Sequence, residues 1–134
     1  MSRDYVAAVV DAIGEQPYVE LVGVVSCLAA VDAFTQLVGA GIAPLPDPHP
    51  GDPTPDDAIP GLKLRRAWVS TAGPRGPHHA LSAAPAIQGT FNRLLDLLYI
   101  DRDDLGDLGP IRALSRTQAE LVILAVSHRN ECFY

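Results

Sequence analysis

The sequence is poor in aromatic side chains, in charge and in cysteine. Aromatic residues make up 6% and charged residues 19% of the 134 residues, whereas about a quarter of an average globular chain is charged. The apolar share is nevertheless 48%, which excludes a chain that is disordered throughout. Alanine, leucine and valine supply most of that share, and they favour thin, closely packed helices over a β-sandwich. We therefore expect an all-α fold in one domain, or in part of one.

The features that are missing also narrow the possible locations and partners. The longest apolar run without charge or proline, Leu21 to Val31, has eleven residues, and a membrane-spanning helix needs about 20. The N-terminus carries Arg3, Asp4 and Asp11 and has no secretory hydrophobic region. The net charge of −6 disfavours binding to nucleic acid or to an anionic membrane by bulk attraction. We expect a cytoplasmic protein that binds neither nucleic acid nor a membrane.

Few residues suggest a disulfide scaffold or a metal site. The two cysteines, Cys27 and Cys132, are too few for a scaffold. Cys27 lies among Val and Ala within an expected helix, where a thiol is usually an inert part of the core. The adjacent His78 and His79 lack Cys or carboxylate partners at helical spacing, so we predict no metal site there. No P-loop, dinucleotide fingerprint or Ser-His-Asp arrangement is present.

The N-terminal third of the chain predicts two helices from its caps and its 3.6-residue apolar period. Ser2 caps the first, which runs to about Ile13 and stops at Gly14. The second runs from about Pro17 to Val38 and is apolar on most sides, so we expect it to be buried in a subunit interface or under other helices. Two buried strands are the alternative there, but the length and the alanines favour a helix.

The C-terminal half predicts two more helices. One covers about Pro85 to Ile100. The other begins at a capping box formed by Ser115 and Gln118 and continues to His128, with the buried apolar run Leu121–Val126 inside it.

A proline-rich linker separates the two pairs of helices. Residues 44–60 hold seven of the twelve prolines together with four aspartates, a density that blocks helix and sheet alike. We expect a solvated spacer there rather than a docking ligand. The predicted organisation is a helical segment at 1–43, a linker at 44–61 and a second helical segment at 62–134.

Glu120 is the first candidate functional residue. It directly precedes the six apolar residues Leu121–Val126 and shares a helical stripe with Leu124 and His128. A carboxylate at the start of a buried apolar helix is costly without a partner. We predict that at least half of it is buried and that its pKa is raised, which suits a proton relay. The alternative is an ordinary Glu near the helix start, favoured by the helix dipole.

The segment Leu114–Tyr134 resembles the active-site region of the alkylhydroperoxidase D-like family, within the carboxymuconolactone decarboxylase superfamily. In that pattern a helix opens with Leu-Ser or Leu-Thr, a Glu precedes a mostly apolar run, and an Asn precedes a Cys-x-x-Cys that a His follows. Glu120 and Cys132 have eleven residues between them, as in the family, and Asn130 precedes Cys132.

The resemblance extends upstream with less specificity. Residues 77–100 look like the family's preceding helix, and residues 2–39 look like the closing helices of an earlier repeat. The chain then resembles the end of one repeat, a linker and the start of a second. The pattern's second Cys would be the residue after Tyr134, with the His a few residues later.

The resemblance implies a helical bundle that assembles as a homo-oligomer and reduces hydroperoxides through thiols. Glu120 would be the proton relay and Cys132 the resolving cysteine, with no metal or organic cofactor and with a dithiol or dihydrolipoyl-type reductant. Without the second Cys, we expect these 134 residues not to turn over peroxide. Two alternatives stay open: a carboxymuconolactone decarboxylase-type lyase, which needs no redox cysteine, and a non-catalytic helical module for oligomerisation.

Overall fold

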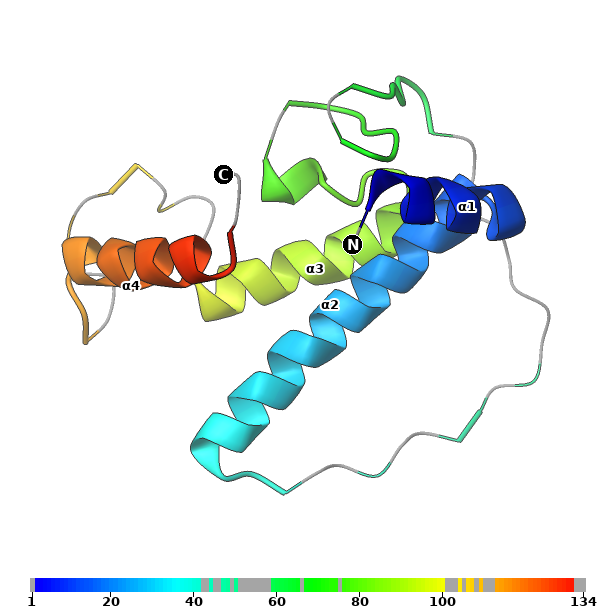
Figure 1. The fold of residues 1–134 in the computed structure, drawn as a ribbon. Coiled ribbons are helices and arrows are strands. Elements are labelled where there is room, and N and C mark those ends of the chain that lie inside the picture. The colour runs from blue at the N-terminus through cyan, green and yellow to red at the C-terminus, as the bar shows by residue number, and fades with distance from the viewer. Residues whose placement is uncertain are drawn as a thin grey trace. The chain divides into compact units, whose positions relative to one another are not determined.

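The computed structural model describes residues 2–41, 44, 47–48, 50, 59–65, 67–74, 76–100, 104, 106–107, 109 and 113–131. Most of these residues lie in four α-helices: α1 (Arg3–Ile13), α2 (Glu15–Val38), α3 (Pro85–Leu98) and α4 (Arg116–Arg129) (Figure 1). A 3-10 helix spans Pro77–His79. The described residues contain no strand, only one isolated antiparallel bridge between Lys63 and Thr71. The predicted all-α class is confirmed.

Local capping explains where α1 and α2 begin and end. The Ser2 side chain accepts a hydrogen bond from the Tyr5 amide, as expected of an N-cap. Gly14 has a φ of 92° and ends α1 through a bond from its amide to the Val10 carbonyl. Because Gly14 tolerates this backbone conformation, the chain turns there and α2 starts at the next residue, earlier than the predicted Pro17. Gly39, in the left-handed conformation, ends α2.

The second pair of helices follows the predicted boundaries closely. α3 starts at Pro85 and ends at Leu98, two residues before the predicted Ile100. The capping box at the start of α4 is complete: the Gln118 amide donates to Ser115 Oγ at 3.3 Å, and the Ser115 amide donates to Gln118 Oε1 at 2.9 Å.

The chain divides into two compact units, Met1–Leu94 and Leu95–Tyr134. In the first unit, Val19 of α2 forms a small core with Leu81, Ala83 and Ala84, against which partly buried apolar side chains such as Ile87 pack. Most of the predicted linker lies outside the described residues, and the division into 1–43, 44–61 and 62–134 stays a prediction.

Two polar contacts attach the segment before α3 to the helices of the first unit. Glu15, the first residue of α2, accepts a hydrogen bond from the Ser70 amide at 2.7 Å. The buried Gln88 of α3 accepts one from the Leu81 amide at 2.6 Å and donates to Asn92 at 2.9 Å. Both contacts satisfy backbone or side-chain groups that would otherwise lose hydrogen bonds on burial.

The expectation that α2 is buried on most sides is wrong for the single chain. Only Val19 and Gly23 are buried. Apolar side chains are exposed on the opposite side and along the C-terminal half of the helix, and they are Leu21, Val24, Val25, Leu28, Val31, Phe34, Leu37 and Val38. In Figure 1 the C-terminal half of α2, in cyan, runs away from α1. Apolar helix surface is stable when it is packed against something. The first unit packs only against the part of α2 around Val19 and Gly23.

The length and composition of α2 are also those of a membrane-spanning helix. It has 24 residues, and its most apolar stretch has a mean hydropathy of 1.9 with 6% of it buried. Core helices of soluble proteins and N-terminal signal segments have the same properties, so the observation does not identify a membrane protein.

The apolar helix expected around Leu121–Val126 forms, but it is not buried within the chain either. No residue of α4 is buried, and Leu121, Val122, Ile123, Leu124 and Val126 are exposed.

Candidate functional site

The candidate site is a cluster of Tyr99, Arg116 and Glu120 within the second unit. The Tyr99 hydroxyl donates a hydrogen bond to Glu120 Oε1 at 2.6 Å. Arg116 Nε donates to the same oxygen, also at 2.6 Å. The Arg116 guanidinium carbon also lies 5.9 Å from the centre of the Tyr99 ring, within reach of a cation–π interaction. One carboxylate oxygen therefore accepts from two donors.

The start of α4 accounts for part of this geometry. Because Ser115 begins the helix, Arg116 and Glu120 stand four residues apart and share one face. Tyr99 comes from the segment directly after α3, 21 residues before Glu120 in sequence. The Arg116 side chain is 14% exposed, and its Nη1 atom is buried without a partner among the described residues.

The predicted rise in the Glu120 pKa is wrong. The hydrogen bond from Tyr99, followed by the one from Arg116, holds the pKa of this carboxyl below its ordinary value, and desolvation, which acts in the opposite direction, is a smaller effect than either. The side chain is 44% exposed, which meets the predicted degree of burial but leaves water close enough to keep desolvation small. Hydrogen bonds to the charged form favour that form.

Tyr99 shifts in the opposite direction. Its hydrogen bond to Glu120 is the largest cause of a raised phenol pKa, and burial adds to it, because the phenol must keep its proton in order to donate. At neutral pH the cluster therefore holds a carboxylate that can accept a proton and a tyrosine that retains one. The relay hypothesis depended on a raised pKa, so the lowered pKa of Glu120 counts against it and agrees with the alternative of an ordinary Glu near the helix start.

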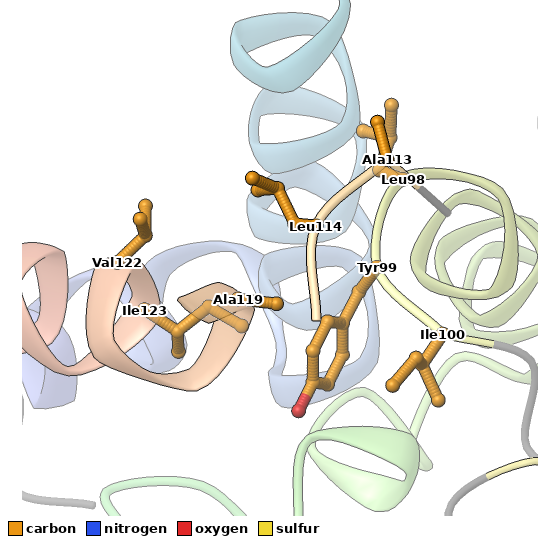
Figure 2. A pocket seen from close by; sticks show the side chains of 8 residues that line it. All are labelled: Leu98, Tyr99, Ile100, Ala113, Leu114, Ala119, Val122 and Ile123. Carbon is orange, nitrogen blue, oxygen red and sulfur yellow. The ribbon is translucent and has the colours of Figure 1, made fainter. Parts of the chain in front are cut away.

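A pocket of about 380 Å³ lies beside the cluster in the same unit. Figure 2 shows Ala119, Val122 and Ile123 of α4 on one side and Tyr99 and Ile100 on the other. The described residues that line it are Leu98, Tyr99, Ile100, Ala113, Leu114, Ala119, Val122 and Ile123. Among the described residues the lining contains no charged side chain, and the volume falls within the range of small-molecule sites.

Cys132 lies outside the described residues, so its position relative to Glu120 stays a prediction. Cys27 is a partly buried free thiol on α2, in the first unit. The contributions of Tyr99 and Arg116 were missed at the sequence level. Arg116 carries a usable signal, its four-residue spacing from Glu120, whereas nothing local points to Tyr99.

The chain matches no protein-family model, no curated protein and no solved structure. The resemblance to the alkylhydroperoxidase D-like family therefore rests on the residue pattern of segment 114–134.

Proposed function

We propose that the chain carries part of a thiol-dependent peroxidase site, in which Glu120 accepts a proton and Cys132 belongs to the redox pair. One observation supports the proposal beyond the sequence pattern: Glu120 is fixed by two donors, at 2.6 Å each, in the first half of a capped helix. A carboxylate held in this way has a defined position and is ionised at neutral pH, so it can accept a proton, and its lowered pKa makes it a weaker base than a carboxylate with a pKa near neutral pH.

The lowered pKa changes the role that the resemblance implies for Glu120. Glu120 takes the proton of the attacking thiol, since only the thiolate is a nucleophile. The thiolate sulfur attacks the terminal peroxide oxygen and becomes a sulfenic acid as the O–O bond breaks, and the alkoxide leaves as the alcohol with the proton that Glu120 took from the thiol. The resulting sulfenic acid condenses with the Cys132 thiol to a disulfide and water, and a dithiol of the dihydrolipoyl type reduces that disulfide. The attacking cysteine is the one that the family pattern places after Tyr134.

The test compares the 134-residue chain with a form extended after Tyr134 by the Cys and the His of the family pattern. Peroxide consumption is measured with a dithiol reductant. We expect turnover from the extended form alone, lost in Cys132→Ser and strongly reduced in Glu120→Gln. Glu20→Gln, on exposed α2 surface, is the matched control and should be unaffected. If both forms are equally active and the activity depends on Cys132, the cysteine added after Tyr134 is not the attacking thiol. If both forms are inactive, the peroxidase proposal is refuted.

A second function, a helical module for self-association, is favoured by the exposed side of α2. Leu21, Val24, Leu28, Val31 and Val38 are exposed and follow the alternating three- and four-residue spacing of a coiled-coil seam. Thr35 occupies the remaining position of that series. This seam, the surface formed by these six residues, lies opposite the side of α2 that packs on Ile87 and Leu81.

A second copy of the chain suits the seam better than lipid does. Glu20 and Asp32 bracket the charge-free stretch of α2, so a bilayer around the whole helix would hold two carboxylates, which are costly within a membrane. The other side of the same helix is already covered near Gly23 by protein, since Ile87 and Leu81 approach it closely. Within an assembly of copies both charges can stay at the edge of the seam, in water.

Sedimentation velocity over a range of concentrations tests this second function. We expect the wild type to associate and Leu28→Glu, which places a charge in the seam, to remain monomeric. Ala29→Glu adds the same charge one residue further along, at an exposed position outside the seam, and should associate like the wild type. A wild type that is monomeric throughout, or one that associates only with vesicles of neutral lipid, would contradict self-association through α2.

A further inference from the structure

The pocket beside Tyr99 has no role in either proposed function. Its volume is about 380 Å³, and its walls come from the end of α3, the two residues after it, the residues before α4 and the first turns of α4. All of these belong to the second unit. The pocket is therefore built within one compact part of the chain.

The chemistry of the lining specifies the class of ligand. Seven of the eight lining residues are aliphatic, and the eighth, Tyr99, contributes an aromatic ring. Arg116 and Glu120 form an ion pair at 2.6 Å and are not part of the described lining, so neither charge is placed in the pocket wall to balance a ligand charge. Bringing an unpaired charge into such surroundings is costly, whereas apolar surface gains about 25 cal/mol per Å² buried.

We propose that this pocket binds an uncharged, mainly apolar small molecule, with the Tyr99 ring and the apolar face of α4 as opposite walls. The Tyr99 hydroxyl oxygen, which donates a hydrogen bond to Glu120, retains acceptor capacity for a hydroxyl group of the ligand. The proposal does not depend on peroxidase activity or on self-association.

Two fluorescent probes that differ by one charged group test the site and its class on the full chain. N-phenyl-1-naphthylamine is uncharged, and 1-anilinonaphthalene-8-sulfonate is the same molecule with a sulfonate. We expect the uncharged probe to bind with a one-to-one ratio and more tightly than the sulfonate. Tighter binding of the sulfonate would overturn the proposed class, because an anionic ligand paired with Arg116 would then be the better description.

Paired substitutions on α4 locate the binding. Ala119→Trp fills the pocket from the helix side, and we expect it to weaken binding of the uncharged probe at least about tenfold, since the buried apolar contact is lost. Ala125→Trp adds the same side chain to the same helix at an exposed position that does not line the pocket, and binding should stay at the wild-type level. If Ala119→Trp loses helical circular dichroism, Ala113→Trp fills the pocket from the segment before α4 and takes its place.

Three results would overturn the proposal. Unchanged binding in the pocket-filling variants would show that the probe sits on exposed helix faces. Equal loss in Ala125→Trp would show that binding follows the whole of α4 rather than the pocket. Binding that disappears as the protein is concentrated would show that a second copy, and not a small molecule, occupies the pocket.

Discussion

Replacing Gly23 with alanine tests how closely α2 approaches the start of α3. A Cβ atom added there would lie 2.6 Å and 3.0 Å from the two γ-carbons of Ile87, and 3.0 Å from Leu81 Cδ1. Separations below 3.0 Å essentially never occur for real Cβ atoms. Ile87 is β-branched, and its stiff γ-carbons lie close to the α3 backbone. The contact can therefore be relieved only if the helices move apart or Ile87 leaves its preferred rotamer.

Two effects of opposite sign determine the outcome. An alanine in a helix interior is better than glycine by about 0.8–1 kcal/mol, whereas overpacking a core costs about 1–3 kcal/mol. We expect the steric term to dominate, so Gly23→Ala lowers the free energy of unfolding of the first unit by up to about 2 kcal/mol. Gly89→Ala on α3 is the control, because its Cβ would meet nothing within 4 Å, and it should be stabilising by about 0.5–1 kcal/mol.

Urea unfolding followed by tryptophan fluorescence measures both variants. Trp68 is the chain's single tryptophan and lies in the first unit, so its fluorescence follows the unfolding of that unit. In the Ile87→Ala background, adding Gly23→Ala should lower the free energy of unfolding less than it does in the wild type. The reason is that the two side chains then no longer collide. If Gly23→Ala stabilises the unit as much as Gly89→Ala does, the close approach of the two helices is refuted.

Three further predictions concern hydrogen bonds. The lowered pKa of Glu120 makes its contribution to stability fully present above its ordinary pKa of 4.5 and lost as the pH falls through the folded value. The raised pKa of Tyr99 makes its contribution full below 10.0 and lost as the pH rises through the folded value. In a plot of the urea midpoint against pH, Tyr99→Phe should reduce the loss of stability at both acid and alkaline pH. Unchanged slopes would contradict the hydrogen bond between Tyr99 and Glu120. Ser115→Ala should destabilise α4 by about 1 kcal/mol, seen as faster amide exchange at its N-terminus, with Thr117→Ala as the control. Glu15→Ala removes the acceptor of the Ser70 amide, whose exchange should accelerate; an unchanged rate would argue against that contact.

The sequence alone was sufficient for the helices because their signals are local. Ser2 and the Ser115–Gln118 pair lie within three residues of the amides they cap, and Gly39 ends α2 by adopting a conformation that other residues rarely take. Gly14 shows the limit of such signals. It was expected only to end α1, but its unusual backbone also allows α2 to begin at the next residue.

Only the tertiary structure decided the state of Glu120 and the environment of α2. The apolar run after Glu120 suggested desolvation and a raised pKa, but the direction depends on which donors arrive, and Tyr99 arrives from 21 residues away through the folding of the second unit. The apolar residues of α2 likewise predict a helix that needs covering without specifying what covers each side. Gly23 shows which side the chain covers itself, because only a residue without a side chain lets Ile87 approach so closely. The opposite side is left exposed because burial depends on contacts between distant segments, and hydrophobic periodicity encodes the need for a contact but not the partner.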